Sequence, residues 1–283
     1  MKAPRRILLS FLLIGTVTSS IPAIEIEKDD KPTTAQMREI LLSGSLRGRA
    51  EAAQRLMALA TPEAMAALFD GMSDTYAAYI AADAVLQRVI QKPDGLAPLL
   101  FPGLKHKDFC TRMLTAYMLG KTGDKSASAE LSAALSDENR DVRLYSAQAL
   151  RKAGDKNAVP ALIKALSDQY GLVRLQAAAA LGQIGNSSAA PNLAKALDDP
   201  DAAINAARAL GKLGGKEAED ALIAKIKAPD PVVSWAVIEA LGAFSKSPAV
   251  SQQLKDLAKS ATNERTKKSY EDASAAIDGR AGK

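Results

Sequence analysis

A leucine that recurs at nearly constant spacing limits, more than any other feature, how this chain can fold. The series is Leu119, Leu150, Leu181, Leu210 and Leu241, at steps of 31, 31, 29 and 31 residues. A fixed period of roughly 20 to 50 residues is typical of repeat arrays, in which each unit packs only against its neighbours. The sequence therefore predicts a linear array of repeats instead of one compact core.

Each repeat is predicted to consist of two helices. A proline stands near the start of the first helix in three repeats, where its fixed φ and missing N–H cost nothing. A glycine follows the second-helix leucine by four residues in four repeats, as expected for a left-handed cap. The prolines are Pro98, Pro160 and Pro191, the glycines are Gly123, Gly154, Gly185 and Gly214, and Ser245 replaces the glycine in the next repeat.

The spacing of apolar residues indicates an all-α fold. In one second helix Val173, Ala177, Leu181 and Ile184 lie on one face, and no alternating pattern typical of β-strands competes with this interpretation. Weaker repeats extend the array in both directions and give about eight helix pairs. The predicted α-solenoid covers residues 33–279, with the strongest repeats at 97–246 and a disordered tail at 280–283.

The N-terminal segment has the order of a secretory signal peptide. Three basic residues precede an apolar run that ends at Val17, and small residues follow. We predict a signal peptide at 1–23, cleaved after Ala23 or Ser19, and a flexible leader at 24–32. The run is shorter than the roughly 20 apolar residues of a membrane-spanning helix, so we expect a periplasmic or secreted protein without stable membrane insertion.

Charge and cysteine content narrow the class of partner. The formal net charge is +5, but removal of the predicted signal peptide leaves 34 basic against 32 acidic residues, a net charge of +2. A chain this close to neutral is not expected to bind nucleic acid. The single cysteine, Cys110, cannot form an internal disulfide, so packing must stabilise the fold in an oxidising compartment.

The repeat resembles a known family. A proline-led first helix, then Ser-Asp, then V-R-x-x-A-A-x-A-L-G-x-I-G is similar to the short HEAT repeats of phycobilisome lyases and of deoxyhypusine hydroxylase, most clearly over residues 98–242. The resemblance implies a right-handed α-solenoid with first helices on the convex side and second helices on the concave face. It implies little about chemistry, because the repeat is a scaffold with many uses.

The residues argue against the enzymes that share this repeat. Deoxyhypusine hydroxylase is understood to hold two irons with several His-Glu pairs, whereas this chain has one histidine, His106, and one cysteine, Cys110. A metal site needs more such ligands, and a catalytic pair of these two residues lacks a third orienting group. We expect a half-buried thiol, an exposed imidazole, no cofactor and no metal. A lyase-like role stays open by residues alone, but those lyases are expected to act in the cytosol.

A column of arginines has two interpretations. Each arginine lies seven residues before the second-helix leucine of its repeat, and in two repeats an aspartate lies six residues before the arginine. The column either faces a ligand or forms a structural ladder, in which arginines pair with acids and satisfy loop carbonyl groups. The fork of donors on arginine favours the ladder. The column comprises Arg49, Arg112, Arg143 and Arg174 with Asp137 and Asp168, and it ends at Ala203 and Ser234.

The candidate partner-binding surface is the polar side of the second helices. Positions two and five before the leucine, and two after it, point away from the apolar stripe at about 100° per residue. Tyrosine and arginine anchor interfaces, although the helix dipole also favours lysine in a last turn without any partner. The candidates are Tyr117, Lys121, Tyr145, Gln148, Lys152, Gln176, Arg208 and Lys212, whereas Trp235 is expected to pack between repeats.

Together these features predict an exported, non-catalytic, monomeric scaffold that binds a protein or peptide partner on the concave face. Two alternatives come from other classes of protein. One is a lyase-like or maturation enzyme of the HEAT kind, and the other is a structural spacer without a defined ligand.

Overall fold

The computed structural model describes residues 32–227 and 230–281. The predicted signal peptide and most of the predicted leader lie outside these residues. Within the described ranges the chain forms sixteen α-helices and no β-strand, and the helices make eight consecutive pairs. The all-α solenoid predicted from the leucine period is therefore confirmed.

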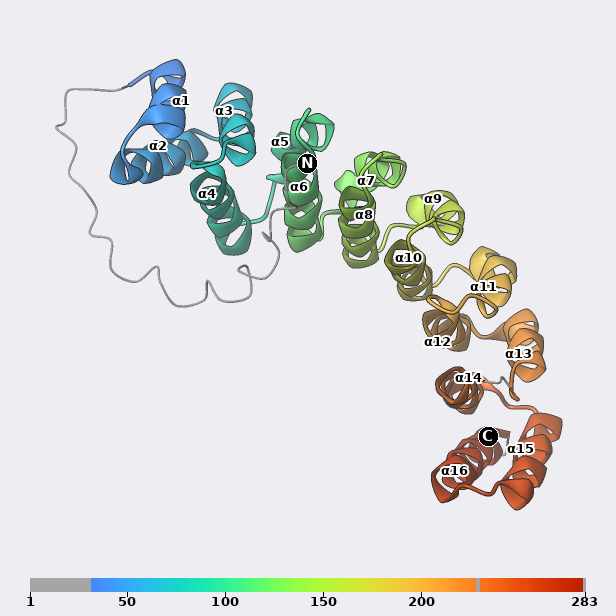
Figure 1. Ribbon diagram of the computed structural model, residues 1–283. Helices are drawn as coiled ribbons and strands as arrows, with labels where there is room; N and C mark the ends of the chain where they lie inside the picture. Colours follow the sequence, from blue (N-terminus) through green and yellow to red (C-terminus); the bar gives the residue numbers. More distant parts are fainter. Residues whose placement is uncertain (1–31, 228–229, 282–283) are drawn as a thin grey trace. The chain divides into compact units, whose positions relative to one another are not determined.

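The two helices of each pair belong to different layers (Figure 1). Second helices pack directly against one another along the array, from α6 to α16. The first helices are α1 (Thr34–Ser43), α3 (Pro62–Ser73), α5 (Ala97–Leu100), α7 (Ser128–Ala134), α9 (Val159–Ala165), α11 (Ala190–Ala196), α13 (Gly215–Ala224) and α15 (Pro248–Ser260). The second helices are α2 (Leu46–Leu59), α4 (Ala78–Gln91), α6 (Phe109–Thr122), α8 (Arg140–Ala153), α10 (Gly171–Ile184), α12 (Ala203–Leu213), α14 (Pro231–Phe244) and α16 (Glu264–Ala281).

The core lies between the two layers and contains the periodic leucines. Each of the five leucines of the series is at most 1% exposed, so the series does mark the buried stripe of the second helices. Burying one leucine side chain stabilises a fold by roughly 1.5 to 3 kcal/mol, and the contribution recurs once per repeat. Proline stands at the first or second position of α9 and α11, as predicted.

Small residues let neighbouring second helices approach closely. A Cβ added to Gly182 in α10 would lie 2.7 Å from the Cα of Ala209 in α12, a distance that real side chains do not reach. Gly120, Gly211 and Gly242 face an alanine of the next second helix in the same way. These glycines directly follow the periodic leucine, and α8 alone departs from the row, because Arg151 follows Leu150.

Three of the four predicted glycine caps have the expected conformation. Gly123, Gly154 and Gly185 are left-handed, with φ between 64° and 73°. Gly214 differs: its φ is 65° but its ψ is −164°, because the chain enters α13 at the next residue. Ser245 ends α14 with φ −60° and ψ 144°, so that turn departs from the others, as its sequence indicated.

The predicted disordered tail is wrong for its first two residues. Helix α16 includes Arg280 and Ala281, and residues 282–283 lie outside the described part of the chain. The guanidinium of Arg280 donates hydrogen bonds to the carbonyl oxygens of Gly242 and Ser245. These carbonyls belong to the end of α14, so the last helix supplies donors to the terminal turn of the preceding second helix.

Candidate protein-binding surface

The eight candidate residues lie on four consecutive second helices, α6, α8, α10 and α12. We call this set the second-helix face. Its lysines and its arginine are exposed, while its two tyrosines and two glutamines are half-buried. It comprises Tyr117, Lys121, Tyr145, Gln148, Lys152, Gln176, Arg208 and Lys212.

An aromatic pair joins α6 to α8 on this face. The rings of Tyr117 and Tyr145 have centroids 5.9 Å apart and meet edge to face at 87°, a favourable arrangement for aromatic pairs. The ammonium of Lys121 lies 5.1 Å from the Tyr117 centroid. Burial, Asp141 and Tyr117 raise the pKa of Tyr145, so its hydroxyl stays protonated and can donate a hydrogen bond. The pair is a rigid amphipathic contact point.

A second aromatic group lies further along the array. Trp235 in α14 is 39% exposed, and the guanidinium of Arg208 in α12 lies 5.8 Å from its ring centroid. The expectation that Trp235 packs between repeats is therefore wrong. Arg208 also approaches Glu239 at 3.9 Å, an exposed ion pair that contributes little to stability.

The junction between α8 and α10 holds polar atoms without partners among the described residues. The Nε of Arg151 and the Oε1 of Gln176 are both buried, and neither has a hydrogen-bond partner there. A buried polar atom left unpaired costs about 1 to 3 kcal/mol. On the neighbouring junction Lys212 of α12 donates to Gln183 of α10 at 3.2 Å, so polar pairing between these helices is possible.

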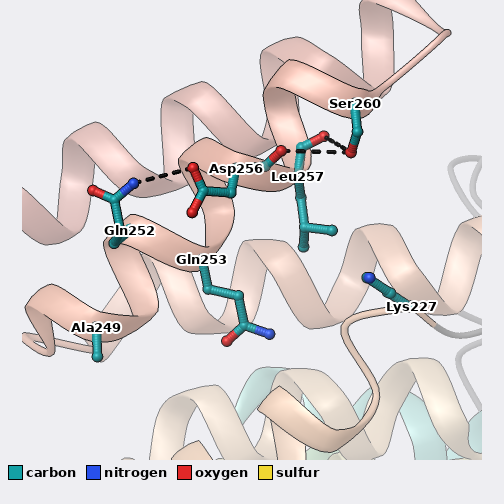
Figure 2. A pocket seen from close by; sticks show the side chains of 7 residues that line it. All are labelled: Lys227, Ala249, Gln252, Gln253, Asp256, Leu257 and Ser260. Carbon is teal, nitrogen blue, oxygen red and sulfur yellow. Dashed lines mark hydrogen bonds between the residues drawn. The ribbon is translucent and has the colours of Figure 1, made fainter.

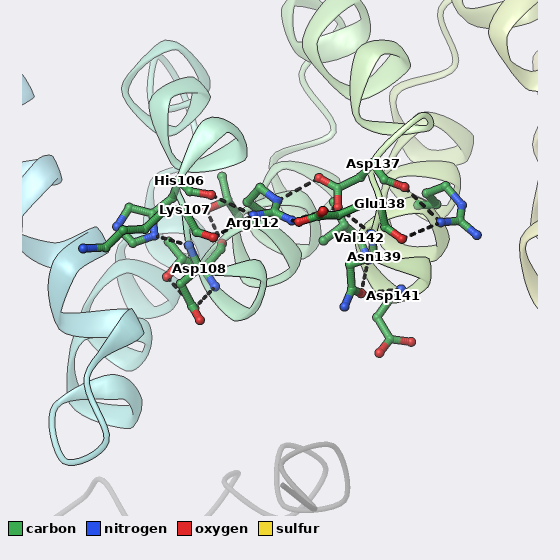
Figure 3. A network of polar contacts seen from close by, with 12 residues as sticks. His106, Lys107, Asp108, Arg112, Asp137, Glu138, Asn139, Asp141 and Val142 are labelled. Carbon is green, nitrogen blue, oxygen red and sulfur yellow. Dashed lines mark hydrogen bonds and ion pairs between the residues drawn. The ribbon is translucent and has the colours of Figure 1, made fainter. Parts of the chain in front are cut away.

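The arginine column connects consecutive repeats (Figure 3). Arg112 donates to both carboxylate oxygens of Asp137, at 2.7 and 3.0 Å, and to the carbonyl oxygens of His106 and Lys107 in its own loop. Arg143 repeats the arrangement one repeat further on, with Asp168 at 2.6 and 2.9 Å. Each guanidinium therefore ties its own loop to the loop of the following repeat.

The burial of the arginine side chains and their pairing with aspartates indicate that the column has a structural role. The Arg112 and Arg143 side chains are 9% and 7% exposed, and the aspartate hydrogen bond, chiefly, raises the pKa of each guanidinium. Burial alone raises the pKa of Asp168, but hydrogen bonds from Arg143 and the Tyr170 amide outweigh it, and the net pKa is lowered. With their donors already engaged, these arginines have little left for a ligand.

The partner of each arginine was not identified from sequence. The aspartate six residues before an arginine belongs to the preceding contact, and the true acceptor lies 25 residues later, in the next repeat. Arg49 with Asp74, at 3.6 Å, and Arg174 with Asp199, at 2.7 Å, follow the same spacing. A constant Arg-x24-Asp spacing was the signal that could have revealed these pairs.

The single histidine is less accessible than expected. The His106 side chain is 14% exposed, its Nε2 lies 3.6 Å from Asp70 in α3, and its Nδ1 accepts the backbone N–H of Asp108. The prediction of an exposed imidazole is therefore wrong, because Asp70 lies beside the loop before α6. Cys110 is half-buried, as predicted.

A cavity of about 560 Å³ lies on the opposite layer, along α15 (Figure 2). Polar side chains along it form hydrogen bonds within α15: Gln252 donates to Asp256 at 3.1 Å, and the Ser260 hydroxyl donates to the Leu257 backbone carbonyl at 3.1 Å. This open cavity includes no residue of the second-helix face. In the described ranges no three His, Cys, Asp or Glu side chains gather as they would to hold a metal ion. No helix within those ranges has the length and apolar character that a membrane crossing requires.

Stacked helix pairs with one exposed row of second-helix side chains define an α-solenoid. The family model for HEAT repeats matches residues 128–204 and 198–275, which together span about half of the chain. The chain therefore belongs to the HEAT-repeat family. No curated protein matches it.

Two solved structures share this fold at low sequence identity. An engineered protein is 20% identical, with a TM-score of 0.52, over 87% of this chain and 79% of its own. The Escherichia coli protein YibA is 21% identical, with a TM-score of 0.55, over 86% of this chain and 93% of its own. Human deoxyhypusine hydroxylase is also 21% identical, over 75% of this chain and 95% of its own, but its TM-score is only 0.39.

Proposed function

We propose that this chain is an exported, non-catalytic scaffold that binds a protein or peptide partner on its second-helix face. The observation that carries the proposal is the pairing of Tyr117 with Tyr145, beside exposed lysines on parallel helices. Rigid aromatic side chains with a polar edge are the groups that most often anchor protein interfaces. The arginine ladder, in contrast, is engaged within the fold, so the binding surface is not there.

Site-specific crosslinking tests this assignment. A photoreactive amino acid placed at Lys121 or Lys152 should yield a partner adduct in cells, because both side chains are exposed on the second-helix face. Matched controls at Lys164 and Lys195, exposed on first helices α9 and α11, should yield none. Adducts formed equally from both layers would count against the proposal.

A triple variant provides the complementary loss of binding. Tyr117→Ser, Tyr145→Ser and Arg208→Gln together remove both aromatic groups of the pair and one cation. The crosslinked partner should bind this variant at least tenfold more weakly, since truncation of interface anchors costs about 2 kcal/mol or more each. Unchanged helical circular dichroism is the control for folding. Binding as tight as that of the unmodified chain would instead favour a spacer without a defined ligand.

Export and the absence of catalysis need their own tests. The proposed export rests on the sequence of residues 1–23, and N-terminal sequencing of the protein from cell envelopes should find a chain that begins near Ile24 or Ser20. The enzyme alternative has a direct readout, because stoichiometric iron or a bound bilin absorbance in purified protein would favour it. Light scattering should give the mass of a monomer.

A further inference from the structure

The α8/α10 junction is where the second-helix face departs from its own pattern. By repeat register, the positions that hold Tyr117 and Tyr145 at the α6/α8 junction are occupied one repeat later by Gln148 and Gln176. Arg151 takes the place of the glycine that contacts alanine at four other junctions. The large polar side chain of Arg151 therefore occupies a position at which four other junctions have glycine, whose side chain is a single hydrogen atom.

Two buried polar atoms without hydrogen-bond partners indicate which groups a ligand would have to bring to this junction. The Arg151 Nε is a buried donor without a partner, and the Gln176 Oε1 is a buried acceptor without a partner. Both side chains are only half-buried, so they can turn outward to meet a ligand, which must bring an acceptor, best an anionic oxygen, and an N–H donor. An extended peptide with an acidic side chain carries both groups on one residue, because its backbone supplies the N–H.

Charge around the junction favours the same ligand. Lys121, Lys152 and Lys212 are exposed on the flanking turns, and within the described ranges none of the three forms an ion pair with a carboxylate. Two carboxylates act on this face, Asp141 near Tyr145 and Glu239 near Arg208, and neither pairs with a lysine of the face. A partner segment with negative charge would therefore be attracted to α6, α8, α10 and α12.

On this basis, and resting on the proposed function, we infer that the partner is an acid-rich extended peptide segment. Its carboxylate binds Arg151 at the α8/α10 junction, its backbone N–H binds Gln176, and an apolar side chain packs on Tyr117 and Tyr145. Packed helices are spaced about 8 to 10 Å apart, and an extended chain advances about 3.3 Å per residue. The apolar and acidic residues should therefore be about three positions apart.

Selection from a library of random 12-residue peptides displayed on phage tests this inference with the full purified chain. We expect enriched peptides to carry Asp or Glu about three positions from an aromatic or large aliphatic residue. A fluorescein-labelled peptide from the selection should bind Arg151→Gln about ten- to hundredfold more weakly, as expected for a lost charge-assisted hydrogen bond. Replacing its acidic residue with the amide should cause a similar loss, and the two changes together should cost little more than one.

Controls separate this inference from the proposed function. Arg151→Lys should retain part of the affinity, and Lys195→Gln on α11 should retain all of it. Peptides that bind the second-helix face without acidic residues, or that bind Arg151→Gln normally, would overturn the inference and leave the proposed function standing. Failure to enrich any peptide that depends on Tyr117 and Tyr145 would count against both. An Arg151-dependent complex with oligo(dT) and none with acidic peptides would also overturn the inference.

Discussion

The central repeats and the C-terminal repeats solve the same packing problem with different side chains. From α6 to α10 every loop is tied to the next by a bidentate arginine–aspartate pair in a periodic position. In α12 and α14 the corresponding positions hold Ala203 and Ser234, and towards the C-terminal end the contacts are individual ones. Lys255 and Ser251 of α15 bond Asp278 of α16, and Arg280 caps α14.

The difference shows which interfaces depend on a repeated element and which depend on side chains that occur once. A repeat inside the array has neighbours on both sides, so one arginine can serve its own loop and the next. In the repeat of α15 and α16 the side-chain contacts named above instead join the two helices of the pair or lead back to α14. Nearest-neighbour coupling should therefore be strongest in the centre and weakest at the C-terminal end.

Removing one ladder arginine should have the largest effect. Arg143→Met leaves Asp168 nearly buried without its cation and leaves two loop carbonyls without a donor. We expect a loss of about 3 kcal/mol, near the lower limit for a broken buried pair, because the ladder lies close to the surface. Urea unfolding followed by circular dichroism measures this loss.

The matched change at the C-terminal end is Lys255→Met. Its side chain and that of Asp278 are 44% and 46% exposed, so solvent and salt already weaken the pair. Stability should change far less than in Arg143→Met. Similar losses from the two substitutions would remove the distinction between central and terminal interfaces. The double variant Arg143→Met with Asp168→Leu should recover part of the loss.

A glycine comparison is the second way to sharpen the contrast. Gly182→Ala places a methyl group 2.7 Å from the Ala209 backbone and must push α10 and α12 apart, at a cost of about 1 to 3 kcal/mol. Gly279→Ala in α16 meets no atom within 4 Å, so it should stabilise the helix by up to about 1 kcal/mol. Thermal melting should move in opposite directions. Equal shifts would mean that helix spacing does not limit the central repeats.

Periodicity explains why so much of the fold could be predicted from sequence. The leucine series and the glycines recur, so each helix pair reinforced the interpretation of the next, and Leu181 and Gly185 are found where the period placed them. The exceptions are residues that occur once. Arg280 and Trp235 depend on a single neighbour in three dimensions, and no repeat in the sequence indicates that neighbour.

The candidate surface was harder to predict than the fold for a related reason. The helical period alone indicates which side chains point away from the core, and it placed Tyr117 and Tyr145 on one face. It does not indicate which of them meet across helices. Arg151 was missed because it occupies a position that is glycine in four other second helices and therefore belongs to the packing row by pattern. That its Nε is buried without a hydrogen-bond partner can be recognised only from the three-dimensional structure.

Acid sensitivity should give the smallest effect and test the same contrast. The lowered pKa of Asp168 means that folding favours its ionised form, so this stabilisation is present above the ordinary aspartate pKa of about 4 and is lost as pH falls through the lower folded value. Urea midpoints measured between pH 6 and pH 3 should fall less in Asp168→Asn, which is already weakened at pH 6.

Asp278 also has a lowered pKa, chiefly through Lys255, but this pair is exposed, so 0.5 M salt should diminish its contribution more than that of Asp168. If salt reduces the destabilisation caused by Asp168→Asn as much as that caused by Asp278→Asn, the ladder is no better shielded from solvent than the terminal pair.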